Sequence, residues 1–276
     1  MSGELVVDTD PGLDDALALT YLWKHHDITL LTTVAGNTYL DDVTNNAAYL
    51  KDLNDAKTPI RKGAAEPLDA PQVTTPFHGE HGLGSVDVED TTVNDFHTEQ
   101  LPDNPVILAI GPLTNIVEMK DALPKNTPCY ILGGTLADGN IHGEEFNFYA
   151  DPQAANQVLQ SHLDITLLPI DVASNHGIPL NEADTYRANQ PSTQRVWDEL
   201  RRASENVQAS TVTPYDLILA YLMTHDTTYT TTSHDACVRT DQAQRGHLSI
   251  TPGDTVDIIK DITDDVTHKA IKQTLQ

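Results

Sequence analysis

The sequence predicts an α/β fold in which a doubly wound, mostly parallel central sheet carries helices on both faces. Three observations support this prediction. Short apolar segments alternate with segments of helical periodicity, several apolar segments end at glycine, and no apolar run is long enough to span a bilayer. A chain of 276 residues can bury a substantial core, and we expect residues 1–276 to form a single domain.

The first part of the chain contains a strand–helix–strand unit of the kind found in parallel sheets. Residues 5–7 and 28–34 are apolar and predict buried strands, and residues 14–24 between them have the apolar spacing of a helix. Residues 41–53 predict a second helix. Residues 67–103 are rich in turn formers and predict a long functional loop.

The alternation continues beyond this loop. Residues 106–110 form an apolar run bounded by proline and glycine, as expected for a fully buried parallel strand. We then expect helices over 113–123 and 151–161, and strands over 129–132 and 165–170. From Thr232 onward, strand-like alternation and a terminal helix predict a cap on the same domain.

The charge balance restricts the possible partners. Asp plus Glu number 41 against 16 Lys plus Arg, a formal net charge of -25, and such a surface repels nucleic acid and anionic membranes. The acidic residues are spread along the chain, which suggests a halophilic protein. The start of the chain lacks a basic and apolar leader, so we expect a cytoplasmic protein. Cys129 and Cys237 are expected to be buried thiols.

An acidic loop follows the first predicted strand. Asp8, Asp10, Asp14 and Asp15 lie within eight residues, and a partly buried loop can keep four carboxylates ionised only beside a cation. Oxygen ligands favour Ca²⁺ or Mg²⁺. Alternatively, these residues form an acidic helix N-terminus capped by Asp10. Asp8 and Asp10 are two residues apart at the end of a strand, so their side chains should point to the same side. This arrangement favours metal binding.

Polar or glycine-rich segments also follow the other predicted strands. They are Gly36 and Asn37, Gly111, and Gly133 with Gly134. Ligands of open α/β sheets bind at the carboxyl ends of the strands, so these segments and the acidic loop predict one shared site.

Residues 8–16, Asp-Thr-Asp-Pro-Gly-Leu-Asp-Asp-Ala, resemble the N-terminal motif of the inosine–uridine-preferring nucleoside hydrolase family. Further segments resemble the family in the same order, namely residues 34–37, 77–83, 110–115, 132–134, 145–147 and 151–155. The resemblance covers nearly the whole chain, although the chain is somewhat short for the family. It implies the nucleoside hydrolase fold, Ca²⁺ as cofactor, a ribonucleoside substrate, a role in purine and pyrimidine salvage, and a homodimer or homotetramer.

The reaction implied is hydrolysis of the N-glycosidic bond to ribose and a free base, through a transition state that resembles an oxocarbenium ion. By resemblance, the metal ligands are Asp10, Asp15, the carbonyl of Ile110, and Asp216. Taken alone, Asp216 would be a helix N-cap before an apolar run. Asp10 would also act as general base on the water that the metal activates.

The resemblance also supplies a set of ribose-binding residues: Asp14, Asn37, Asn140, Glu145 and Asn147. Taken alone, Asn37 would be a turn residue. Glu145 and Asn147 would be polar residues of a solvent-exposed loop. The spacing from Asn140 to Glu145 is one residue shorter than we expect.

Two residues are candidates for protonating the leaving base. Many members of the family carry His before the late metal-binding Asp, where this chain has Tyr215. A phenol with a pKa of about 10 is protonated at neutral pH but is a poorer general acid than His. His78 is the second candidate, and its alternative is an exposed loop histidine. Tyr215 and His78 therefore stay open as alternatives.

Two other function classes compete with this interpretation. In a haloacid-dehalogenase-type phosphatase, Asp8 would be the nucleophile, Asp10 the general acid and Mg²⁺ the metal, with residues 253–257 as a late acidic motif. That class also needs a Lys at a strand end, and the sequence has no convincing one. A non-enzymatic calcium-binding module would explain the acidic loop but not the polar residues after the other strands.

Overall fold

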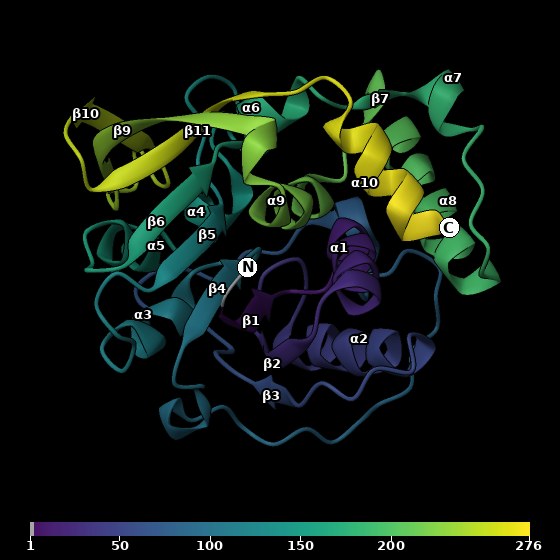
Figure 1. The fold of residues 1–276 in the computed structure, drawn as a ribbon, viewed down its shortest axis with the longest axis horizontal. Coiled ribbons are helices and arrows are strands. Elements are labelled where there is room, and N and C mark those ends of the chain that lie inside the picture. Colours follow the sequence, from purple (N-terminus) through teal and green to yellow (C-terminus); the bar gives the residue numbers. More distant parts are fainter. Residues whose placement is uncertain (1–2) are drawn as a thin grey trace.

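The computed structural model describes residues 3–276 (Figure 1). Within this range, nine strands form one sheet in the order β10-β9-β11-β6-β5-β4-β1-β2-β3. Their bounds are β1 Glu4–Thr9, β2 Ile28–Thr33, β3 Ile60–Lys62, β4 Pro105–Ala109, β5 Pro128–Leu132, β6 Asp164–Leu168, β9 Tyr229–Val238, β10 Leu248–Pro252 and β11 Val256–Ile262. All pairings are parallel except those of β9 with β10 and β11, so the prediction of a mostly parallel sheet is confirmed.

Helices cover both faces of this sheet, as predicted (Figure 1). Their bounds are α1 Leu13–His25, α2 Leu40–Leu53, α3 Thr114–Lys120, α4 Phe146–Ala150, α5 Pro152–Leu159, α6 Ile170–Ser174, α7 Leu180–Ala183, α8 Pro191–Asn206, α9 Tyr215–Thr224 and α10 Val266–Leu275. One apolar core joins α1, α2, α8, α9 and α10 to the sheet, and a second core joins α3 and α5 to its opposite face. None of the helices within residues 3–276 is both long and apolar enough to span a membrane.

The direction of the chain reverses beside β1. The chain runs outward from β1 through β2 to β3, and then returns to place β4 on the other side of β1. Such a reversal opens a crevice at the carboxyl ends of the two neighbouring strands, where ligands of open α/β sheets bind. Asp10 follows β1 and Ile110 follows β4, so the predicted acidic loop and the predicted carbonyl ligand both lie at this crevice.

Segments with a regular apolar pattern in the sequence form most of the expected strands and helices. Other segments of the structure differ from the prediction. The long loop over 67–103 contains two short 3₁₀ helices, η1 (Pro76–His78) and η2 (Thr98–Gln100); a third, η3 (Asp226–Thr228), precedes β9. The predicted strand over 165–170 is too long, because β6 ends at Leu168 and Ile170 already lies in α6. The sequence did not predict β3, α4, α6, α7, α8 or the small ribbon of β7 (Ile178–Pro179) and β8 (Thr211–Val212). Cys129 is buried as expected, whereas Cys237 is only half-buried in β9, and both are free thiols.

Candidate active site and metal centre

A cavity of ≈ 690 Å³ lies at the carboxyl edge of the sheet. Nine of the residues predicted from the sequence line it: Asp14, Asn37, His78, Ile110, Asn140, Glu145, Asn147, Tyr215 and Asp216. Asp10 and Asp15 do not line the cavity but are buried beside it, in contact with Asn37. The structure therefore brings together every residue of the predicted site, from segments far apart in the sequence.

Three carboxylates meet where α1 and α9 pack together. Asp14 and Asp15 lie in the first turn of α1, Asp216 lies in the first turn of α9, and oxygen atoms of the three side chains lie within 4.8 Å of one another. Burial is the main cause that raises the pKa of each carboxyl, and repulsion between neighbouring carboxylates raises those of Asp15 and Asp216 further. The pKa of Asp14 is raised to about 6, although backbone N–H groups of Tyr215 and Asp216 donate to it. Such a group of buried acids needs protons or a cation.

Asp10 completes this acidic group from the end of β1. Its Oδ2 accepts a hydrogen bond from the Asn37 backbone N–H at 2.7 Å, while its buried Oδ1 has no hydrogen-bond partner among the described residues. Burial, followed by repulsion from Asp15, raises the pKa of Asp10 well above its ordinary value. A buried carboxylate oxygen without a partner, beside three more carboxylates, fits a hard cation with oxygen ligands.

Two glycines in the loops after β2 and β4 lie against Asp10. A Cβ on Gly36 would collide with Asp10 Oδ2, and a Cβ on Gly111 would lie 2.7 Å from Asp10 Oδ1. Any larger residue at either position would displace the carboxylate. These two glycines therefore position the acidic group and give no sign of binding a ligand themselves.

Asp8 has a different environment from Asp10. It is fully buried in β1, where its Oδ1 accepts hydrogen bonds from Thr32 Oγ1 and from Asn115 Nδ2 at 2.7 Å. Burial raises its pKa to about 7. Asp8 does not line the cavity. Its contacts instead tie β1 to β2 and to α3.

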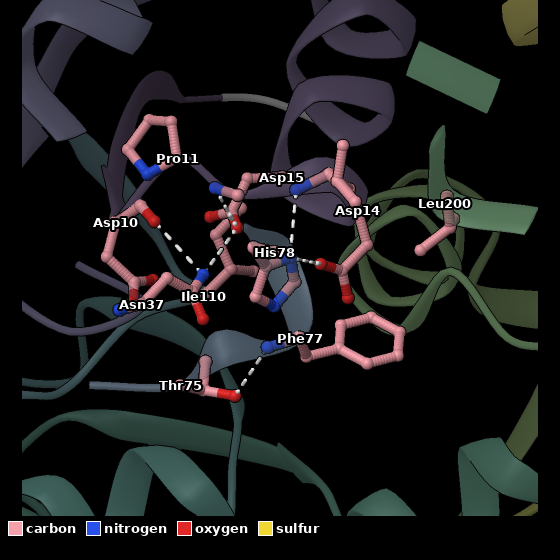
Figure 2. A network of polar contacts seen from close by, with 12 residues as sticks. Asp10, Pro11, Asp14, Asp15, Asn37, Thr75, Phe77, His78, Ile110 and Leu200 are labelled. Carbon is pink, nitrogen blue, oxygen red and sulfur yellow. Dashed lines mark hydrogen bonds and ion pairs between the residues drawn. The ribbon is translucent and has the colours of Figure 1, made fainter. Parts of the chain in front are cut away.

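Two asparagines, Asn37 after β2 and Asn147 in α4, are held by the groups around the acidic centre. Asn37 Nδ2 donates to the Asp10 carbonyl at 3.0 Å and to Asp15 Oδ2 at 3.2 Å, as Figure 2 shows. Asn147 Nδ2 donates to the carbonyls of Ile110 at 3.3 Å and Leu132 at 3.2 Å. Because both amide nitrogens donate to the protein, the side-chain oxygen is the atom that each asparagine can offer to a ligand.

Glu145 is a buried helix cap and not the solvated loop residue that its sequence position alone suggested. It is 2% exposed, and its carboxylate accepts hydrogen bonds from the backbone N–H groups of Asn147, Phe148 and Gly134 at 2.7–3.0 Å. Burial nevertheless raises its pKa to about 7. Asn140 Oδ1 accepts from the Phe146 N–H at 2.9 Å, so Asn140 reaches the cavity despite its shortened spacing from Glu145.

His78 is buried in η1, which excludes the alternative of an exposed loop histidine. Its Nδ1 accepts a hydrogen bond from the Leu13 N–H at 3.0 Å and lies 3.8 Å from Asp14 Oδ1 (Figure 2). Burial lowers the pKa of His78 to about 4, so the ring is neutral at pH 7. Because Nδ1 accepts, we assign the single ring proton to Nε2.

Tyr215 begins α9, and its hydroxyl lies 3.3 Å from Ser174 Oγ. Burial is the main cause that raises its pKa above the ordinary phenol value, so the hydroxyl keeps its proton at neutral pH. Both predicted candidates for meeting the base therefore present a neutral hydrogen-bond donor.

The outer wall of the cavity was not identified from the sequence. It contains the apolar side chains of Phe77, Ile141, Phe146 and Val207, together with hydroxyl groups that include Thr211 and Thr213. Phe77 and Phe146 are the sequence neighbours of His78 and Glu145, and both lie within motifs that resemble the family. The end of α8 carries no comparable signal, because its residues reach the cavity through long-range packing of α8, against α1 and η1 among others.

Residues 5–270 match the sequence profile described as inosine-uridine preferring nucleoside hydrolase. The non-specific ribonucleoside hydrolase RihC of Escherichia coli strain SE11 is 35% identical over 188 residues, an alignment that covers 62% of this chain and 62% of that protein. A solved plant nucleoside hydrolase, the PpNRh1 enzyme, superimposes with a TM-score of 0.87 at 21% identity, over 100% of this chain and 99% of that one. A purine-preferring ribonucleoside hydrolase from Gardnerella vaginalis gives a TM-score of 0.85 at 20% identity, over 98% of both chains.

Proposed function

Because this chain belongs to the inosine-uridine preferring nucleoside hydrolase family, we propose that it hydrolyses the N-glycosidic bond of ribonucleosides to ribose and a free base. The observation that carries the proposal is the buried acidic group beside a cavity lined by polar side chains from α1, α4, α9 and the loop after β2. The alignment with the RihC relative spans less than two thirds of that protein's length, and the activity in its name supports the proposal.

Calcium is the cation that we propose for the acidic group, with Asp10, Asp15, Asp216 and the Ile110 carbonyl as its ligands. The orphaned Oδ1 of Asp10 and the mutual repulsion of the buried carboxylates support this assignment. When bound, calcium supplies a Lewis acid that lowers the pKa of a water molecule. Asp14 lies close enough to Asp15 and Asp216 to be a further ligand.

Different residues of the chain act on the water, the ribose and the base. Asp10 accepts the proton of the attacking water, because its carboxylate can contact both the proposed calcium ion and a water molecule. The ribose hydroxyls are held by Asp14, Asn37, Asn140, Glu145 and Asn147. These contacts hold the sugar in the bound substrate as well as during the reaction.

Tyr215 is the group that we propose as proton donor to the leaving base. Its hydroxyl is protonated at neutral pH, and the residue lines the cavity. His78, neutral and protonated on Nε2, donates a hydrogen bond to the bound substrate but does not act as an imidazolium acid. The outer wall adds apolar and hydroxyl side chains, which suit an uncharged purine or pyrimidine base.

A nucleoside panel tests the proposed function. Purified protein with 1 equivalent or more of calcium is incubated with inosine, adenosine, guanosine, uridine and cytidine, and release of base is followed by chromatography. We expect hydrolysis by the wild type and a loss of about 10³-fold in Asp10→Asn, the size typical of a lost general base. Asp52→Asn is the matched control, because Asp52 is exposed and remote from the cavity. Failure of the wild type to cleave any of the five nucleosides would refute the proposal.

A further inference from the structure

The turn that joins β9 to β10 lies against α4, the short helix that carries Asn147 and begins at Glu145. Arg245 in this turn donates from Nε to the Tyr149 carbonyl at 2.7 Å and from Nη2 to the Ala150 carbonyl at 3.0 Å. The same Nη2 donates to the Pro71 carbonyl at 2.9 Å. The guanidinium carbon also lies 4.6 Å from the centre of the Tyr149 ring.

The backbone of the turn approaches α4 as closely as its side chains do. Gly246 has a φ of 84°, and a Cβ there would lie 2.7 Å from Tyr149 Cα and 2.9 Å from Tyr149 N. Only glycine tolerates this conformation together with this contact. Next in the chain, His247 Nδ1 lies 3.1 Å from Glu144 Oε1. The turn therefore contacts both ends of the segment from Glu144 to Ala150.

Leu248 extends this contact to the group that holds Glu145. Leu248 is 4% exposed, and a Cβ on Gly134 would lie 2.8 Å from Leu248 Cδ2. The Gly134 N–H is one of the three donors to the Glu145 carboxylate. Packing by Leu248 thus keeps Gly134 close to Glu145.

The contacts of Arg245 matter because α4 is too short to be stable alone. It has five residues, and the last carbonyls of a helix lack partners within the helix. The Arg245 guanidinium satisfies two of these carbonyls and places a positive charge at the negative end of the helix. Its third partner, Pro71, belongs to the loop that continues to Thr74–His78 on another side of the cavity.

From these contacts we propose that Arg245 is a positioning residue, which joins α4 to the 67–78 loop and thereby fixes Glu145 and Asn147 in the cavity. The proposal rests on the proposed function, in which these two residues hold the ribose. Arg245 itself does not line the cavity and does not touch the substrate. It acts through the backbone of α4.

Kinetics of Arg245→Met and Arg245→Lys, made in the full chain, test this proposal. Ribose contacts are present before and during the reaction, so Arg245→Met should raise KM on the order of tenfold while kcat changes much less. Arg245→Lys keeps one charged donor and should restore part of the loss. Arg239→Met is the matched control, because Arg239 lies in the same turn and pairs with exposed Asp241. Its KM should equal that of the wild type.

Hydrogen exchange provides a readout that does not depend on activity. The backbone N–H groups of Tyr149 and Asp151 donate within α4, so peptides covering 146–151 should exchange faster in Arg245→Met than in the wild type or Arg239→Met. Gly246→Ala should produce the same two effects and serves if Arg245→Met does not fold.

Unchanged exchange in α4, or an equal rise of KM in Arg239→Met, would overturn the role of Arg245. An inactive wild type would instead refute the proposed function, and the exchange measurement would then decide alone whether Arg245 holds α4.

Discussion

Removal of calcium should destabilise this protein at neutral pH and much less at acid pH. The four carboxyls of Asp10, Asp14, Asp15 and Asp216 have raised pKa values in the folded chain. A carboxyl of this kind stays protonated in the folded state at pH values where the unfolded chain has already released its proton. Stability of the calcium-free protein is therefore fully present below the ordinary carboxyl pKa near 4 and is lost as the pH rises through the raised values.

The raised pKa of Asp14 gives the size of one contribution to the pH dependence of the free energy of unfolding. Its pKa rises from 3.8 to about 6. At about 1.4 kcal/mol per pKa unit, ionising this one buried group costs roughly 3 kcal/mol between pH 4 and pH 7. A cation that binds only the folded state raises the free energy of unfolding by about 2.7 kcal/mol at a concentration of 100 times its Kd. At about 2–4 °C per kcal/mol for a chain of this size class, calcium should raise Tm by about 5–10 °C at pH 7.5.

The assay is thermal unfolding after treatment with a chelator, with and without added CaCl₂, at pH 7.5 and pH 4.5. The rise in Tm should be large at pH 7.5 and small at pH 4.5, where protons compete for the carboxylates. Asp216→Asn should abolish the rise, and the exposed Asp52→Asn should keep it. The reasoning is refuted if calcium leaves Tm unchanged at pH 7.5, or if Asp216→Asn responds like the wild type.

Three further changes test the site and the surface. Gly36→Ala places a Cβ against Asp10 Oδ2, so it should lower nucleoside hydrolysis by about 10²-fold and remove the calcium-induced rise in Tm; retention of both would contradict the role of Gly36. Tyr215→Phe should lower kcat by about 10²-fold through loss of the proton donor, measured as base release, and an effect confined to His78→Gln would assign that role to His78. Raising KCl from 0.1 M to 1 M shortens the screening length from about 10 Å to about 3 Å, so Tm of a chain with net charge -25 should rise, and a fall would count against halophilic character.

The sheet and the acidic centre were predictable because the signals for both are local. Apolar runs that end at glycine marked strands such as β4 and β5, and a strand's carboxyl end fixes which loop reaches the crevice. The acidic loop was visible because its four carboxylates lie within eight residues. Asp216 could be connected with them only through the family resemblance, because the spacing of residues in the sequence does not show that α1 packs against α9.

The parts that were missed depend on long-range packing. Glu145 looks like a loop residue in the sequence, and it becomes a buried cap only because Gly134 and the start of α4 surround it. The end of α8 forms a cavity wall because α8 packs on α1 and η1. Cys237 was expected in a core, but β9 lies near an edge of the sheet, which leaves its thiol half-buried. Local periodicity does not encode these neighbours.

The meeting of Asp15 and Asp216 has a consequence for the way the protein is made. The ribosome releases α1 early, whereas α9 emerges only after most of the chain has been synthesised. Until α9 docks, Asp14 and Asp15 lack the third carboxylate of their group. The nascent chain therefore cannot assemble the complete cation site while its first strands begin to pair. If calcium occupies this group as proposed, its binding belongs to a late step of folding, and the ion would then connect α1 with α9.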